Sequence, residues 1–147
     1  MSKKDGPKFY VASKVVHWRM WQEFKKDNNI IATWIDRMEG LPLVDGVEER
    51  TPEEWVEIAQ SCMDEAARCD VLVFYARPGE RWRGAFMEIG AALGAGARVH
   101  VVVDGDDVDG RLQNDFGEIL LPHPNVRERE DLDAAFKSGW TYWEVMQ

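Results

Sequence analysis

Apolar and polar positions follow one another along the chain in a pattern that predicts strands and helices in turn. Runs rich in β-branched and aromatic residues, typical of strands, lie at 8–13, 29–36, 70–75, 98–103 and 125–128. Segments with apolar residues at helical spacing lie at 17–26, 51–69, 84–97 and 131–140. This order predicts an α/β fold: a three-layer sandwich with a parallel, four- to five-stranded sheet of the Rossmann or flavodoxin-like type. The length of 147 residues suits one domain, 1–147.

Two neighbouring segments carry the clearest local signals. The helix at 51–69 is predicted to begin with Thr51 as N-cap and Pro52 in the first position, and Glu54 completes a capping box. The run DVLVFY (70–75) is apolar without interruption after its first residue, as in a central parallel strand that is covered on both faces. Residues 37–50 hold Gly, Pro and acids without a period and are predicted to form a loop.

The charge of the chain narrows the classes of partner. Its formal net charge is −9, from 27 acids against 18 bases, and an acidic surface repels phosphate backbones. We therefore expect no duplex nucleic acid as partner. No apolar run reaches the ~20 residues of a membrane span, so no membrane partner is expected. The opening MSKKDGPK lacks the apolar core of a signal peptide, and we expect a cytoplasmic protein.

The cysteines and histidines do not form a metal-binding pattern. Cys62 and Cys69 are seven positions apart, which is neither a CxxC spacing nor an obvious disulfide. His17, His100 and His123 are scattered along the chain. The sequence therefore predicts no metal site, no cofactor and reduced thiols.

Polar and aromatic residues follow the predicted strands where ligands bind in open parallel sheets, beyond the carboxyl ends. Because these ends meet at one edge, we expect the following residues to form a binding site: Ser13, Lys14, His17, Trp34, Asp36, Tyr75, Arg77, Glu80, Arg83 and Gly84. Each also has a simpler interpretation. Lys14 and His17 are at a helix start where they would be solvated, Trp34 would be a core residue at a strand end, and Asp36 an ordinary loop acid or cap. The arginines would be surface ion-pair partners worth little.

Glu88 is an acid in a helix whose other residues are mostly small or apolar. Ala85, Ala92 and Ala95 leave space beside it, and the helix N-terminus is expected to keep its carboxylate ionised. An ionised carboxylate near a ligand edge is suited to nucleophilic attack or to support of a carbocation-like centre. The alternative is that Glu88 caps exposed amides or pairs with Arg83.

The stretch CDVLVFYARPGERWRGAFMEIGAALGAG (69–96) resembles the core of the nucleoside 2-deoxyribosyltransferase-like family. The family's strand-opening Asp and its G-x-x-x-E-hydrophobic-G-x-A helix correspond to Asp70, Gly84, Glu88, Ile89, Gly90 and Ala92. FYVAS resembles the family's opening strand, and YVASK, TWID and HPNV are further similar to a bacterial and phage subgroup, so the resemblance covers about residues 8 to 130. Its most specific part is the helix that carries Glu88.

This resemblance implies a mechanism and roles for two residues. Glu88 would be the nucleophile that attacks C1′ of a deoxyribose and displaces the base, after which a second base or water accepts the sugar. Tyr10 would steady the Glu88 carboxylate, while Asp70 would be structural. The resemblance implies no cofactor.

One departure from the family pattern bears on the activity. The transferases have a second acid six residues before the nucleophile, where this chain has Trp82. The loop instead offers Arg77, Arg81 and Arg83, which suit a 5′-phosphate, while Trp82 would stack on a base and Glu80 would stand in as proton donor.

Three functions remain open from the sequence. The first is cleavage or deoxyribosyl transfer at the N-glycosidic bond of a nucleoside or nucleoside 5′-monophosphate. The second is a non-catalytic module that binds or sequesters a nucleotide or an NAD-derived signal, and the third is a scaffold. Trp55 on its helix offers material for an interface, and the aromatic tail GWTYWEVMQ (139–147) is expected either to dock on the chain's own core or to cover a neighbour, so we expect a homo-oligomer.

Overall fold

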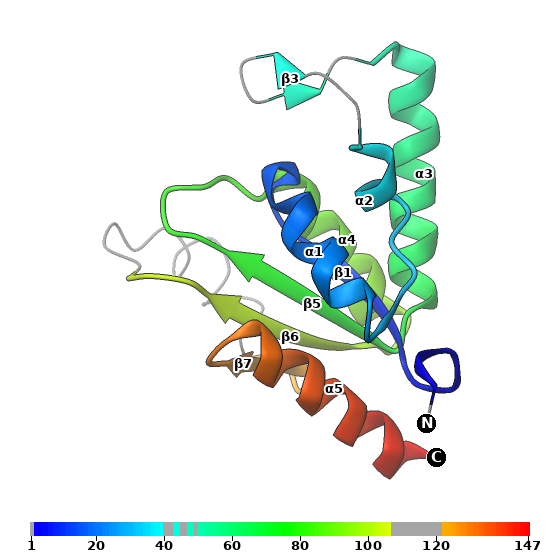
Figure 1. The fold of residues 1–147 in the computed structure, drawn as a ribbon, viewed down its shortest axis with the longest axis vertical. Coiled ribbons are helices and arrows are strands. Elements are labelled where there is room, and N and C mark those ends of the chain that lie inside the picture. Colours follow the sequence, from blue (N-terminus) through cyan, green and yellow to red (C-terminus); the bar gives the residue numbers. More distant parts are fainter. Residues whose placement is uncertain (1, 40–42, 45–46, 49, 107–121) are drawn as a thin grey trace.

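The computed structural model describes residues 2–39, 43–44, 47–48, 50–106 and 122–147 (Figure 1). At its centre is a five-stranded sheet of order β2-β1-β5-β6-β7, in which each neighbouring pair is parallel. The strands are β1 (Lys8–Ala12), β2 (Asn29–Ile30), β5 (Val71–Ala76), β6 (Arg98–Val103) and β7 (Val126–Arg129). The chain changes direction across the sheet between β1 and β5, which is where ligands bind in sheets of this type.

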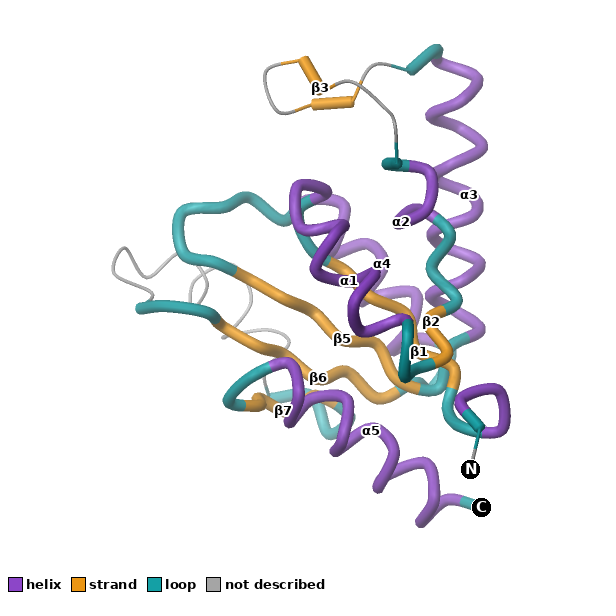
Figure 2. The backbone as a smooth tube through the Cα atoms, viewed as in Figure 1, coloured by secondary structure: helices purple, strands orange, loops and turns teal. Residues whose placement is uncertain are grey.

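Helices cover both faces of the sheet, which confirms the predicted three-layer α/β sandwich (Figure 2). Two helices, α1 (Trp18–Lys25) and α5 (Leu132–Met146), lie on one face, and α3 (Pro52–Arg68) and α4 (Arg83–Gly94) lie on the other (Figure 1). The smaller elements are α2 (Trp34–Arg37), the 3₁₀ turns η1 (Lys3–Asp5) and η2 (Val15–His17), and the antiparallel pair β3 (Leu43–Val44) and β4 (Val47–Glu48).

Side chains alternate along the strands and divide the core between the two faces. Phe9 of β1 points towards α5, where its ring centroid lies 4.8 Å from that of Phe136. Phe74 of β5 points towards α4, with its ring centroid 6.1 Å from that of Trp82. α5 passes so close to β1 that a Cβ at Gly139 would lie 2.5 Å from the Phe9 ring. A glycine is therefore required where these two elements cross.

The helix ends follow the predicted capping signals. At the start of α3 the amide of Glu54 donates to Thr51 Oγ1 and the amide of Thr51 donates to Glu54 Oε1, both at 3.2 Å. The predicted capping box is thus confirmed, with Pro52 in the first turn. At the start of α5, Asp131 accepts a hydrogen bond of 2.8 Å from the amide of Ala134.

The strand predicted at 29–36 is wrong beyond its first residues. β2 ends at Ile30, and α2 begins at Trp34. The reason is a set of contacts with distant segments. Glu65 of α3 accepts hydrogen bonds from the amide and the hydroxyl of Thr33, and the Trp34 indole donates to the carbonyl of Val11 at 3.0 Å. These bonds turn the chain away from the sheet edge.

Two further boundaries differ from the sequence prediction. β3 and β4 lie inside the segment 37–50 that was predicted as a loop, and parts of that segment are outside the described residues. α5 continues to Met146, so that most of the aromatic tail is helical. Within it Trp140 donates to Asn28 Oδ1 at 2.9 Å, which shows that the tail packs on its own chain.

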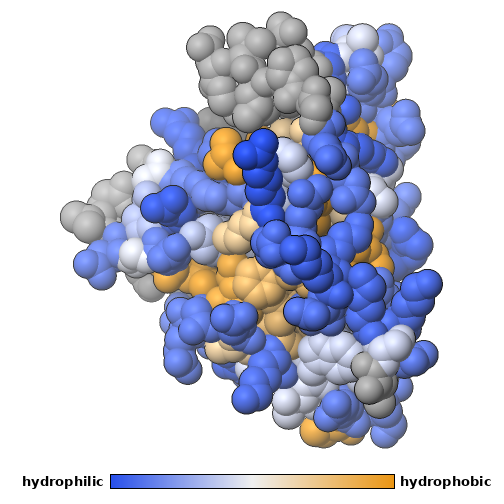
Figure 3. Space-filling view, viewed as in Figure 1, coloured by the Kyte–Doolittle hydropathy of each residue, from blue (hydrophilic) through white to orange (hydrophobic). Residues whose placement is uncertain are grey.

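Hydrophilic residues cover most of the face seen in Figure 3, and apolar residues gather near its centre. None of the helices in the described ranges is long and apolar enough to cross a membrane.

Candidate functional site

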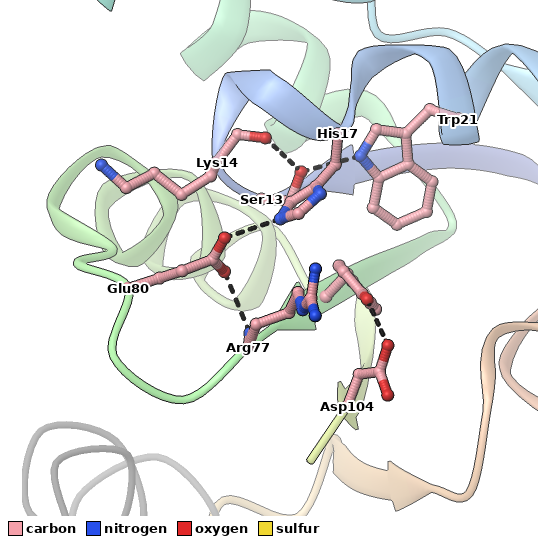
Figure 4. Close-up of polar contacts among 8 residues, drawn as sticks. Ser13, Lys14, His17, Trp21, Arg77, Glu80 and Asp104 are labelled. Atoms are coloured by element: carbon pink, nitrogen blue, oxygen red, sulfur yellow. Dashed lines mark hydrogen bonds and ion pairs between the residues drawn. The ribbon is translucent and has the colours of Figure 1, made fainter. Parts of the chain in front are cut away.

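The structure brings five of the predicted site residues together where β1 and β5 end (Figure 4). His17 Nε2 and Glu80 Oε2 share a hydrogen bond of 2.6 Å, although they are 63 positions apart. The amide of Arg77 donates to the other oxygen, Glu80 Oε1, at 3.0 Å. Ser13 and Lys14 lie beside this pair, directly after β1. The predicted convergence at the sheet edge is therefore present for these residues.

The hydrogen bonds around Ser13 fix the turn that leaves β1. Ser13 Oγ accepts from the indole Nε1 of Trp21 at 2.8 Å and donates to the carbonyl of Lys14 at 2.8 Å. The Trp21 ring is buried, so the serine is anchored to the core. Ser13 is thus a structural anchor at the edge, while the Lys14 side chain extends into solvent.

Two cations at this edge, Lys14 and Arg77, have no carboxylate within ion-pair distance among the described residues. Both side chains are exposed. A lysine and an arginine next to the carboxyl ends of parallel strands are suited to hold a phosphate group. We name Lys14, His17, Arg77 and Glu80 the edge cluster.

Tyr75 connects the edge cluster to the next strand. Its hydroxyl donates to Asp104, the residue that follows β6, and its ring meets the His17 ring edge-on at 5.0 Å between centroids. Burial and the Asp104 carboxylate raise the pKa of Tyr75 to about 12. Sequence reasoning missed Asp104, although a polar residue directly after the strand VHVVV was a usable signal.

Glu88 lies in a second cluster, on the face of the sheet covered by α3 and α4. Its neighbours are Tyr10 of β1 and, on α3, Cys62 and Glu65, each of which acts on its pKa. The Tyr10 side chain is fully buried, and its hydroxyl makes no hydrogen bond in the described part of the chain. Burial raises the pKa of Tyr10 most, and the Glu88 charge raises it further. Tyr10 and Glu88 therefore belong to the same cluster, and the role of Tyr10 in steadying the carboxylate stays a prediction.

The expectation that the helix N-terminus keeps Glu88 ionised is wrong. Burial raises the pKa of Glu88 to about 8, the Tyr10 hydroxyl lowers it in part, and the Glu65 charge raises it further. The favourable effect of a helix N-terminus is confined to the first turn, and Glu88 is the sixth residue of α4. Burial therefore favours the protonated form of Glu88 in the free protein.

Glu65 is a buried acid that sequence reasoning also missed. It is 6% exposed and accepts two hydrogen bonds from Thr33, at 3.0 Å from the amide and 2.8 Å from Oγ1. Cys62 and Ala66 are buried on the same face of α3. A carboxylate within this apolar stripe was the signal that could have revealed it. Its role in the fold is to tie the β2–α2 connection to α3.

Other predicted site residues serve the fold. Trp34 is buried on α2, and Asp36 of the same helix forms an ion pair of 2.6 Å with Lys25. Trp82 is 4% exposed and packs against Phe74 and Phe86, so the expectation that it stacks on a base is not met. Burial of this large ring at the start of α4 stabilises the fold more than its exposure to solvent would.

Two residues at the entrance to α4 complete the predicted set. Gly84 is exposed, and a Cβ there would meet no atom within 4 Å. The Arg83 side chain lies outside the described part of the structure, and the alternative that Glu88 pairs with it stays open. Glu80 was predicted to stand in as proton donor, but both of its oxygens are engaged, by His17 and by the Arg77 amide. In the described ranges, no group of three or more His, Cys, Asp or Glu residues is placed to hold a metal ion.

Together these features define the chain as an α/β sandwich with a polar cluster at the strand ends. A second cluster, which contains Glu88 and Tyr10, lies on the face of the sheet covered by α3 and α4. No family model matches the sequence, and no curated protein matches it. Among solved structures, a CMP N-glycosidase of Clostridium botulinum, BcmB, is similar, with a TM-score of 0.43 and 13% sequence identity. The alignment covers 92% of this chain and 99% of that one.

Proposed function

We propose that the chain cleaves the N-glycosidic bond of a nucleoside 5′-monophosphate or nucleoside, or transfers its sugar, with Glu88 as the nucleophile. The observation that carries this proposal is the position of the motif acid: Glu88 lies close to the buried, unpartnered Tyr10 hydroxyl. A hydroxyl without a partner is costly inside a protein. The Tyr10 hydroxyl is thus available to steady a carboxylate that becomes charged during the reaction.

The chemistry proceeds in two displacements. The ionised Glu88 oxygen bonds to C1′ while the bond from C1′ to the base nitrogen breaks, and the base keeps the electron pair and takes a proton from water. Water or a second base then attacks C1′ and gives up a proton to the hydroxide left by the first step, the ester bond to Glu88 breaks, and the carboxylate is restored. Positive charge that develops at C1′ favours the ionised form of Glu88.

The edge cluster supports a phosphorylated substrate. Lys14 and Arg77 offer unpaired cations, and His17 is held in place by Glu80 at 2.6 Å. This arrangement favours nucleoside 5′-monophosphates over nucleosides.

A binding module without turnover is the second candidate. The observation that favours it is the pKa of Glu88, about 8, since a protonated carboxyl is a poor nucleophile at neutral pH. In that case a nucleotide would raise the thermal midpoint equally in the wild type and in Glu88→Gln, and neither would release a base.

The test is release of free base from a panel of ribo- and deoxyribonucleosides and their 5′-monophosphates, followed by chromatography. We expect the wild type to release base from at least one monophosphate and Glu88→Gln to lose about a thousandfold or more in rate. Glu144→Gln, at an exposed acid of α5, is the matched control and should keep wild-type activity. Binding of the whole panel without release of any base would contradict the proposed enzyme activity and support the binding module.

We also propose that the chain forms a homo-oligomer. Large apolar side chains are exposed on α3 and α4, with Trp55 40%, Val56 58% and Met87 63% accessible. Such residues support a contact with a second copy. Light scattering at two protein concentrations tests it, and a monomer at both would contradict it.

A further inference from the structure

Three arginines and a histidine lie together on the α5 face of β6 and β7. Arg98 and His100 are alternate residues of β6, and the strand register places Arg127 of β7 directly opposite His100. Arg129 follows two positions later, opposite Val102. Alternate and directly opposed residues of paired strands share a face, so these side chains are neighbours. We call Arg98, Arg127 and Arg129 the arginine cluster.

Contacts with α5 confirm which face this is. The Arg98 guanidinium lies over the Tyr142 ring at 4.5 Å, and Arg129 Nε donates to Ser138 Oγ at 2.9 Å. His100 Nδ1 donates to the carbonyl of Ala135 at 2.9 Å, and its Nε2 is buried without a partner among the described residues. Burial first, and then the three arginine charges, lower the pKa of His100 to about 4. The histidine is therefore neutral and adds no charge to the cluster.

No carboxylate of the described residues lies within ion-pair distance of the arginine cluster. Arg127 donates to the carbonyls of Pro124 and Val126, and Arg129 Nη1 donates to the carbonyl of Glu128. Arg98 Nε is buried and makes no hydrogen bond. In a chain with 27 acids and 18 bases, three neighbouring arginines without a carboxylate are an unusual concentration of positive charge.

We infer that the arginine cluster is a binding site for a small ligand that carries a phosphate or pyrophosphate group. Guanidinium groups bind phosphate through paired hydrogen bonds, and each of these three keeps donors that no atom of the described residues accepts from. The bound anion would offset the repulsion among the arginines. The overall charge of −9 opposes a nucleic acid duplex on this surface and leaves a small anion as the ligand.

This site is separate from the proposed reaction. The arginine cluster lies between β6, β7 and α5, whereas the edge cluster follows β1 and β5. The inference therefore holds or fails independently of any glycosidase activity.

Calorimetric titration with sodium pyrophosphate and inorganic phosphate, against sodium chloride at equal ionic strength, tests the inference. We expect pyrophosphate to bind more tightly than phosphate, and Arg127→Gln or Arg98→Gln to weaken it at least about tenfold. Arg127→Lys, which keeps the charge and loses the paired geometry, should weaken it less. Arg68→Gln, at an exposed arginine of α3 on the opposite face, should bind as the wild type does.

Two outcomes would overturn the inference. One is the absence of heat beyond the chloride control. The other is binding that Arg77→Gln abolishes while Arg127→Gln leaves it intact, because the anion would then sit at the edge cluster. Circular dichroism of each variant separates loss of binding from loss of folding, and Arg127→Lys serves as the second variant if Arg127→Gln does not fold.

Discussion

Tyr10 of β1 and Glu88 of α4 act on each other across one face of the sheet. The Glu88 charge raises the pKa of Tyr10, and the Tyr10 hydroxyl lowers the pKa of Glu88. Neither has an ion-pair partner in the described residues, and the Tyr10 hydroxyl is fully buried. The pair therefore couples ionisation of the acid to a hydroxyl that makes no hydrogen bond among the described residues. This coupling makes the chemistry of Glu88 sensitive to both pH and substitution.

The first prediction concerns the pH dependence of kcat/KM for base release. Because the pKa of Glu88 is about 8 and attack requires the ionised form, kcat/KM should rise with pH to a midpoint near 8. Tyr10→Phe removes the group that lowers this pKa and should move the midpoint up. Glu65→Gln removes a charge that raises it and should move the midpoint down. A midpoint that stays unchanged in both variants would mean that another group limits the rate.

The second prediction concerns stability. The folded protein holds the Glu88 proton up to about pH 8, whereas the unfolded chain releases it near 4.5, so the free energy of unfolding falls as pH rises between these values. His100 acts in the opposite direction, since its pKa falls from 6.5 to about 4 on folding, and its contribution is complete above 6.5. Between pH 6.5 and 8 the wild type should therefore lose at most about 2 kcal/mol.

Urea unfolding at several pH values measures this loss. Glu88→Gln should show a flatter profile between pH 6.5 and 8, while Glu144→Gln should keep the wild-type slope. Equal slopes in all three proteins would show that Glu88 does not carry the raised pKa.

The third prediction concerns the edge cluster. Lys14→Gln and Arg77→Gln should each raise KM for a nucleoside 5′-monophosphate about tenfold, because each removes a charge-assisted contact to phosphate. The KM of the corresponding nucleoside should stay the same, since it lacks the phosphate. Steady-state kinetics with the two substrates provide the comparison. An equal rise of KM for both substrates would mean that Lys14 and Arg77 do not contact the phosphate.

Part of this architecture was accessible from the sequence because its signals are local. The apolar run of β5, the capping box of α3 and the motif around Glu88 each lie within a few neighbouring positions. Asp104 and Glu65 gain their roles from partners about thirty positions away, Tyr75 and Thr33, and such contacts leave no periodic trace. The prediction that Glu88 is ionised failed for a related reason, because burial between α3 and α4 outweighs the local effect of the helix end.

The fourth prediction tests the packing of α5 on β1. Gly139→Ala should destabilise the fold by about 1–3 kcal/mol, because the new Cβ would lie 2.5 Å from the Phe9 ring and the core must shift. Gly90→Ala, at an exposed glycine inside α4 where a Cβ meets nothing within 4 Å, is the matched control and should stabilise by roughly 0.5–1 kcal/mol. Thermal and urea unfolding measure both. A neutral Gly139→Ala would contradict the close crossing.

The most direct test of the nucleophile is intact-mass spectrometry of the protein after reaction with a 2-deoxy-2-fluoro nucleoside 5′-monophosphate, whose fluorine slows both displacements. We expect a mass increase equal to the fluorosugar phosphate without its base, located on the peptide that contains Glu88, in the wild type and in Glu144→Gln but not in Glu88→Gln. Base release without an adduct at Glu88, or at an equal rate in Glu88→Gln, would contradict it.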